Sequence, residues 1–220
     1  ILFFLQDHLS ASIVIVAIIS IMMIMAGTKL KHFLCIAFAG GSAAAAGMLL
    51  LATMSDKGSF RLARLTTFLN PWADPTGDGW KVIQGLYAIG SGGLFGKGLG
   101  KSLQKLGYIP ESQNDMIFSI ICEELGLFGA VCIILVFAVM LWRIAHIAQN
   151  SPDLFGTLLA TGLFAHIAIQ VILNIAVVTN IIPNTGVSLP FISYGGSSAV
   201  VLLAEVGIVM NISGKIKLEV

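Results

Sequence analysis

The chain has 220 residues, of which 57% are hydrophobic and 10% charged, and its mean hydropathy is +0.95. Soluble domains carry about 25% charged residues, so this is the composition of a membrane protein. The formal net charge of +1 gives no sign of a nucleic-acid partner. Because the chain opens on Ile1, without a Met and directly in apolar sequence, we expect a fragment of a longer protein.

Long apolar runs predict an all-α, polytopic membrane helix bundle that forms a single membrane domain over residues 1–220. A transmembrane helix needs about 20 apolar residues. Five runs meet this requirement, at residues 9–28, 33–55, 116–142, 154–178 and 189–211. The polar stretch TNIIPNTG (179–186) separates the last two. The three cysteines, Cys35, Cys122 and Cys132, lie in apolar runs without metal-ligand spacing, which favours a packing role.

Basic residues in the short connections predict the orientation, because cytoplasmic loops are enriched in Lys and Arg. Five such residues fall on one side of the predicted bundle: Lys29, Lys31, Arg143, Lys215 and Lys217. That side, which includes the C-terminus, is therefore expected to be cytoplasmic. Residues 56–114 then form a long extracytoplasmic loop.

The predicted loop has structure of its own. Apolar residues at helical spacing from Trp80 to Tyr87 predict a short amphipathic helix at the membrane surface. Seven glycines between positions 85 and 100 would let the backbone approach a ligand or another chain closely. The stretch FGKGLGKS (95–102) ends like a phosphate-binding P-loop, but Phe95 replaces the first glycine and no strand precedes it, so we reject that interpretation.

Four of the 11 acidic residues lie between positions 110 and 126, where an apolar run begins. Asp115 has two compatible interpretations: a helix N-cap, shared with Asn114, or a partly desolvated catalytic base at the outer membrane surface. Glu123 and Glu124 would lie roughly 12 to 14 Å deeper along the helix, too far to share a reaction centre with Asp115. Structural pairing inside the bundle is the expected role for them, and also for Glu205.

Other polar groups allow both structural and functional interpretations. Five basic residues flank the loop glycines, where they would either anchor lipid headgroups or hold a pyrophosphate-bearing lipid: Arg61, Arg64, Lys97, Lys101 and Lys105. The stretch PNTGVSLPFISYGGSS (183–198) breaks regular backbone at membrane depth, which is tolerated where backbone is buried in protein or lines a wet cavity. The four isolated histidines, His8, His32, His146 and His166, receive no role.

Several of these motifs together resemble the SEDS family, which includes FtsW, RodA and SpoVE. The long extracellular loop and following helix of that family are similar to residues 61–126, RLARLTTFLNPWADPTGDGWKVIQGLYAIGSGGLFGKGLGKSLQKLGYIPESQNDMIFSIICEELG. The family's C-terminal signature resembles PNTGVSLPFISYGGSS followed by NIS (211–213). LQDHLSAS (5–12) looks like the family's QPDLGT-type motif, but Asp7 stands where Pro is usual and His8 where an acid is common.

The resemblance implies the C-terminal half of a peptidoglycan glycosyltransferase of the bacterial cytoplasmic membrane that polymerises lipid II. Asp115 falls at the family's essential Asp and would act as general base. A divalent cation, Mg²⁺ or Mn²⁺, is considered as a cofactor, although no metal ligand is assigned. A class B penicillin-binding protein is the implied protein partner. The residues expected to bind substrate are Arg61, Arg64, Lys97, Lys101, Lys105, Glu111, Ser193, Tyr194, Gly195, Gly196 and Ser197.

Two other functions remain open at the level of sequence. One is a flippase that moves lipid II across the membrane, which the broken backbone at 179–198 and the acids within the membrane would suit. The other is a non-catalytic scaffold that recruits cell-wall enzymes. The polymerase is favoured because the richest group of polar residues is extracytoplasmic, whereas transporter sites lie near the bilayer midplane.

Overall fold

The computed structural model describes residues 9–28, 31, 64, 66–77 and 79–216, and within these ranges it contains helices and no strands. The elements are α2 (Leu9–Met25), η1 (Pro71–Ala73), α5 (Trp80–Gly92), α6 (Ile117–Gln149), α7 (Leu154–Val178) and α8 (Gly196–Gly214). The predicted helix at 33–55, the motif at 5–12, and the residues Lys29, Arg61 and Lys217 lie largely or wholly outside the described ranges.

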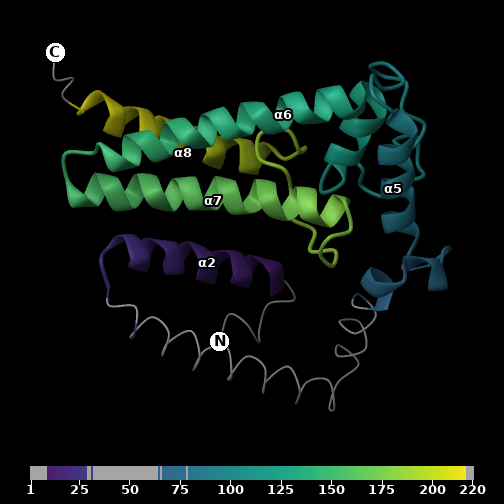
Figure 1. The fold of residues 1–220 in the computed structure, drawn as a ribbon, viewed down its shortest axis with the longest axis horizontal. Coiled ribbons are helices and arrows are strands. Elements are labelled where there is room, and N and C mark those ends of the chain that lie inside the picture. Colours follow the sequence, from purple (N-terminus) through teal and green to yellow (C-terminus); the bar gives the residue numbers. More distant parts are fainter. Residues whose placement is uncertain (1–8, 29–30, 32–63, 65, 78, 217–220) are drawn as a thin grey trace.

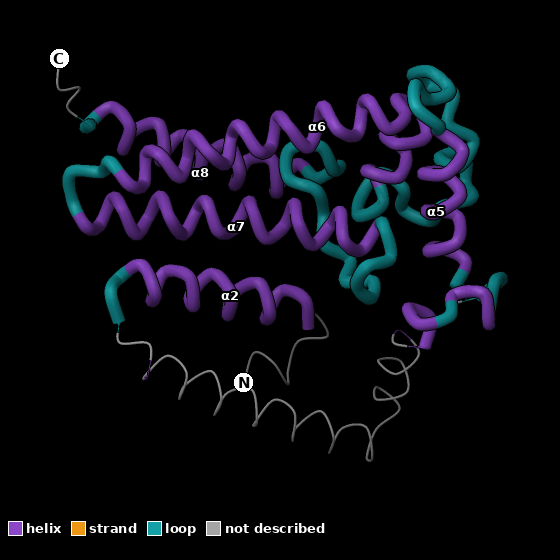
Figure 2. Tube along the Cα trace, viewed as in Figure 1, coloured by secondary structure: helices purple, strands orange, loops and turns teal. Residues whose placement is uncertain are grey.

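Three long helices form a bundle with α5 across one end (Figure 1). α6 and α7 run antiparallel and make the most extensive contact, and α8 packs against both. α2 lies along the other side of α7. α5 stands nearly perpendicular to α6 and α7, among the loops at that end of the bundle (Figure 2). This end therefore gathers the loops before α6 and after α7.

Among the described residues, three helices are long and apolar enough to cross a membrane, namely α6, α7 and α8, while α2 contains a shorter apolar stretch, Ala11–Met25. The prediction of an all-α membrane bundle is thus confirmed, and α7 has the predicted bounds of 154–178. The predicted start of the last helix at Leu189 is wrong, because α8 begins at Gly196. Pro190 fixes its own φ and lacks an N–H, and Phe191 has φ of 63°, so this segment turns instead of continuing a helix.

α6 is longer than the predicted 116–142 and is broken at Gly126, whose φ of 70° and ψ of −169° are not helical. The loop after α5 docks at this break. The amides of Lys97 and Gly98 donate to the carbonyls of Glu123 and Glu124, both at 2.9 Å. A Cβ on Gly126 would lie 2.3 Å from the nitrogen of Gly96. The loop glycines therefore permit close backbone approach to α6 of the same chain, whereas the predicted approach to a ligand or another chain stays a prediction.

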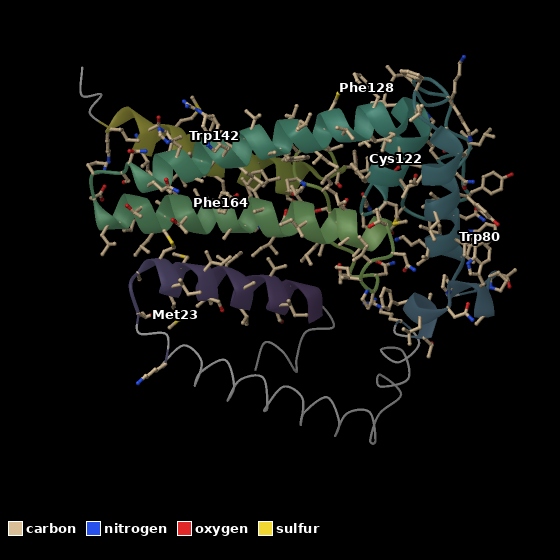
Figure 3. The ribbon with its side chains drawn as sticks, in the orientation of Figure 1. Met23, Trp80, Cys122, Phe128, Trp142 and Phe164 are labelled. Carbon is tan, nitrogen blue, oxygen red and sulfur yellow. The ribbon has the colours of Figure 1, made fainter. Side chains whose placement is uncertain are left out.

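The main core extends along α6 and α7, where α5, α8 and the loop after α7 pack against them, and it includes Met116, Phe118, Ile167, Leu189 and Leu202. By contrast, α6 exposes large apolar side chains along its length, including Phe128 and Trp142 (Figure 3). An exposed apolar face this long is suited to lipid or to a partner helix. Cys122 is buried as predicted, but Cys132 is exposed on α6, so its predicted packing role is wrong.

Candidate active site

Asp115 lies immediately before α6 at the end of the bundle that α5 crosses, and it is only 7% exposed. Lys81, in the first turn of α5, donates to both of its carboxylate oxygens, at 2.9 Å to Oδ1 and 2.8 Å to Oδ2. α5 brings this lysine to the carboxylate from 34 positions earlier in the chain. The result is a partly buried ion pair at a loop-rich end of a membrane bundle.

The N-cap interpretation of Asn114 and Asp115 is wrong. Met116 occupies the N-cap of α6, and no side chain caps the helix there. Asp115 is instead fixed through its backbone by Asn174 near the end of α7. The Asn174 amide donates to the carbonyl oxygens of Asp115 and Val187, both at 2.8 Å, and the residue is fully buried. One side chain therefore joins Asp115, α7 and the loop that follows α7.

The polar segment before α8 is joined to the residues that precede Asp115. The hydroxyl of Ser193 donates to the carbonyl of Asn114 at 2.5 Å and accepts from the amide of Leu189 at 2.7 Å. The amide of Tyr194 donates to the carbonyl of Gln113 at 2.9 Å. The sequence motif at 183–198 and the PESQND motif thus form one structural unit around Asp115.

A polar cavity of about 180 Å³ lies beside this unit. Its lining includes the charged side chains Arg64 and Lys81 and the amides Asn180 and Asn184. Two cationic groups next to amides match the needs of a ligand that combines phosphate with sugar hydroxyls. Arg64, one of the predicted substrate-binding residues, therefore lies at the cavity that borders the Lys81–Asp115 pair.

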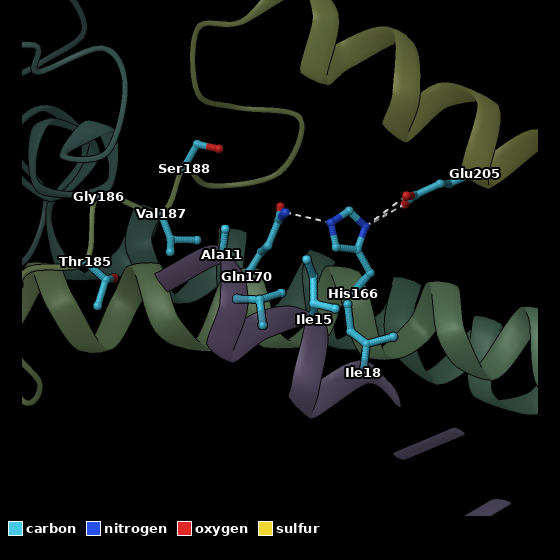
Figure 4. Close-up of a pocket in the computed structure, with 11 residues that line it drawn as sticks. Ala11, Ile15, Ile18, His166, Gln170, Thr185, Gly186, Val187, Ser188 and Glu205 are labelled. Atoms are coloured by element: carbon cyan, nitrogen blue, oxygen red, sulfur yellow. Dashed lines mark hydrogen bonds and ion pairs between the residues drawn. The ribbon is translucent and has the colours of Figure 1, made fainter. Parts of the chain in front are cut away.

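A larger groove of about 540 Å³ runs along the bundle between α2, α7, α8 and the loop at 185–188 (Figure 4). α2 contributes an apolar wall that includes Val14, Ile15 and Ile18. At its loop end, a Cβ on Gly186 would lie 4.0 Å from Oδ2 of Asp115. The groove therefore ends close to the candidate base.

Two of the predicted substrate-binding lysines lie in ion pairs with the deeper acids. Lys97 contacts Glu123 and Lys105 contacts Glu124, each at 2.6 Å. Glu123 is fully buried and also accepts from the hydroxyl of Ser102. The predicted structural pairing of both glutamates is confirmed, although their partners come from the docked loop and not from another helix. A role of these lysines in substrate binding stays a prediction.

The remaining predicted site residues occupy varied positions. Lys101 is exposed in the docked loop, and the exposed Glu111 accepts from the side-chain amide of Asn114 at 3.2 Å. Tyr194 is 79% exposed. Gly195 is the N-cap of α8, and Gly196 and Ser197 are in its first turn, next to the Ser193 contact. Their assignment as substrate contacts stays a prediction.

The sequence interpretation missed three residues of this region: Lys81, Asn174 and His166. His166 is not isolated, because its Nδ1 lies 2.9 Å from Oε1 of Glu205, and this contact confirms the predicted pairing of Glu205. Gln170 adds a contact of 2.7 Å to Nε2 of His166. A polar residue in the middle of an apolar run was the available signal for both Asn174 and His166.

Within the part of the chain that the structure describes, no group of three or more His, Cys, Asp and Glu side chains could hold a metal ion. Mg²⁺ sites completed by substrate phosphates need only one or two protein carboxylates. Asp115 is the buried carboxylate beside the polar cavity, and Lys81 already contacts both of its oxygens. The divalent cation therefore stays a prediction, without an assigned ligand.

Comparisons with known proteins find a matching family and similar sequences. A family model described as cell cycle protein, FtsW/RodA/SpoVE, matches residues 1–218. Stage V sporulation protein E of Bacillus subtilis is 47% identical over 208 residues, which cover 94% of this chain and 55% of that protein. A probable peptidoglycan glycosyltransferase FtsW of Trichlorobacter lovleyi is 44% identical, over 97% of this chain and 54% of its own length.

Solved structures show the same fold. A structure described as showing the coordination of polymerization and crosslinking by a peptidoglycan synthase complex matches with a TM-score of 0.74 and 27% identity, over 99% of this chain and 59% of that one. An Asp-to-Ala mutant of the Thermus thermophilus rod shape determining protein RodA matches with a TM-score of 0.60 and 25% identity, over 99% and 54%. The chain spans about half the length of the curated relatives it matches. It belongs to the SEDS family of FtsW, RodA and SpoVE proteins.

Proposed function

We propose that the protein acts as a peptidoglycan glycosyltransferase that polymerises lipid II at the outer face of the bacterial cytoplasmic membrane. The observation that carries this proposal is the Asp115 carboxylate, which is nearly buried and paired with a lysine that also lines a polar cavity. Relatives named as probable peptidoglycan glycosyltransferases support the choice of reaction.

In the proposed reaction, Asp115 accepts the proton of the 4-hydroxyl of the acceptor sugar. That oxygen attacks the anomeric carbon of the donor from the face opposite the leaving group, so the configuration inverts. The bond from the anomeric carbon to the pyrophosphate oxygen breaks, and its electron pair leaves with undecaprenyl pyrophosphate. A carboxylate has about four lone-pair positions, so Asp115 can accept this proton while Lys81 remains bound.

The polar cavity and the groove would hold different parts of the lipid-linked sugar. The cations Lys81 and Arg64 face the polar cavity, where they would offset the charge that develops on the departing pyrophosphate. The groove has an apolar wall along α2 and would take the isoprenoid chain. Because the groove ends near Gly186 and Asp115, the reactive head of the substrate would lie at the base.

The proposed orientation puts Asp115 outside the cytoplasmic membrane and the C-terminus in the cytoplasm. Lys215 and Arg143 lie at the bundle end opposite Asp115, as Lys and Arg in cytoplasmic loops would.

The proposed protein partner is a class B penicillin-binding protein, and a matching structure is described as a complex for polymerization and crosslinking. The exposed apolar side chains of α6 offer a surface for a partner helix or for lipid.

A lipid II flippase is the second candidate. The observation that favours it is the His166–Glu205 pair, which lies inside the groove and midway along two spanning helices. Polar groups at this depth are typical of transporters.

The deciding experiment uses the full-length protein in liposomes, together with lipid II and the penicillin-binding protein that is its proposed partner. Asp115→Asn keeps the shape of the side chain and removes the base, so we expect at least about a 100-fold loss of polymerisation, the lower range for general base catalysis. Asp153→Asn is the matched control, because Asp153 caps α7 at the other end of the bundle and Asn caps equally well. Normal strand synthesis by Asp115→Asn would refute the proposal. Lipid translocation without polymerisation would establish the flippase instead.

A further inference from the structure

His166 and Glu205 form a hydrogen-bonded pair at the middle of two membrane-spanning helices. His166 is the central residue of α7 (Leu154–Val178) and Glu205 that of α8 (Gly196–Gly214). Each is more than about 13 Å of helix axis from either end at 1.5 Å per residue, so the pair lies midway along both helices, within the groove. Ionisable side chains at this depth are costly and tend to be retained for a function.

The pair is the polar link between α8 and the rest of the bundle. Within the described residues, no other side-chain hydrogen bond or ion pair joins α8 to another helix. Apolar packing of α8 is sparse, because its buried residues are Leu202, Val209 and Ile212. Gly195 and Gly196 connect α8 to the preceding segment without side chains. The angle of α8 therefore depends strongly on the contact between Glu205 and His166.

α7 and α8 both connect to the candidate base. On α7, Asn174 binds the carbonyl of Asp115 two helical turns beyond His166. On the α8 side, Ser193 and Tyr194 bind the carbonyls of the two residues before Asp115, directly ahead of the helix start. A contact that fixes α8 against α7 thus fixes the two supports of Asp115 relative to each other.

We propose that His166 and Glu205 are positioning residues: the contact between their side chains sets α8 against α7 and so holds the segment that carries Asp115 in place. Gln170 orients the imidazole from its other side, with its amide 2.7 Å from Nε2 (Figure 4). The pair lines the groove but lies deep within it, whereas Asp115 is at its loop end. Of this inference, only the predicted effect on the rate of polymerisation rests on the proposed glycosyltransferase function.

The test combines distance measurements with kinetics on the protein as the cell makes it, in liposomes. Spin labels on cysteines at Val136 of α6 and Val200 of α8, which are 68% and 69% exposed, report the position of α8 in a background without native cysteines. Glu205→Leu should shift or broaden the distance distribution and lower kcat about tenfold, with KM for lipid II within twofold. Glu205→Gln, which still accepts from Nδ1, should lie between this variant and the wild type.

A charge exchange separates positioning from folding. His166→Glu combined with Glu205→His restores the pair and should return the distances and kcat toward the wild-type values. Unchanged distances in Glu205→Leu, or an exchanged variant that folds but keeps the Glu205→Leu distances, would overturn the proposal. A raised KM without a change in distance would assign the pair to substrate binding, which also overturns it. The distance measurements do not depend on enzymatic activity. They therefore test the positioning role of His166 and Glu205 even if Asp115→Asn contradicts the proposed function.

Discussion

The contact between Lys81 and Asp115 leads to a prediction about catalysis. Lys81 contacts both carboxylate oxygens, so it restrains the rotation of the Asp115 side chain as well as offsetting its charge. Replacing Lys81 by Met keeps much of the length and apolar stem of the side chain but removes the ammonium group. The base would then lie at the same backbone position without its only side-chain hydrogen-bond partner among the described residues.

The expected magnitude follows from the exposure of the pair. A hydrogen bond to a charged group contributes about 1.5–3 kcal/mol net. Lys81 and Asp115 have side chains that are 24% and 10% exposed, which favours the lower end of that range. If about 1.5 kcal/mol serves to hold the base, its loss corresponds to roughly a tenfold fall in rate. Misplacement of the carboxylate by about 1 Å would extend the fall toward 100-fold.

The assay is single-turnover polymerisation of lipid II by purified protein, with the folded fraction of each variant matched. Lys81→Met should lower kcat about 10- to 100-fold, whereas Lys81→Arg keeps the charge and should lose less. Lys215→Met is the control, because this exposed lysine follows the far end of α8. A folded Lys81→Met protein with kcat within twofold of the wild type would refute the argument that the lysine holds the base.

Three further predictions concern the supports of the site. Gly126→Ala should lower the melting temperature in detergent, because the added Cβ would lie 2.3 Å from the backbone nitrogen of Gly96 and because φ of Gly126 is 70°. Gly90→Ala is the control and should leave the melting temperature unchanged, because Gly90 lies in α5 with open space around it. Lys97→Met should cost about 2 to 3 kcal/mol of unfolding free energy in denaturant titrations, because it leaves the fully buried Glu123 without its cation. Asn174→Leu should lower both stability and kcat through the two carbonyls that it leaves without a donor, and unchanged values of either quantity would contradict this.

The parts of the fold that local sequence determines could be predicted. α7 has the expected bounds because its 25 residues form a mainly apolar run without Asp, Glu, Lys or Arg, between an Asp N-cap and a polar stretch. The break in α6 could not be predicted, since its cause is the loop that docks at Gly126 from about 30 positions earlier. Asp115 could be identified from its motif, but its contact with Lys81 depends on the perpendicular placement of α5. The same holds for His166 and Glu205, which are 39 positions apart.

Burial and pairing alone do not distinguish the candidate base from the structural acids. Glu123 is more buried than Asp115, and both carboxylates contact a lysine at hydrogen-bonding distance. The difference lies in what surrounds each pair. Glu123 also accepts from Ser102 and from loop amides, so its hydrogen-bonding capacity is largely used within the scaffold. The carboxylate of Asp115 accepts only from Lys81 among the described residues, and that lysine faces a cavity. Unused acceptor capacity beside open space is what a general base needs, and it is Asp115 that retains it.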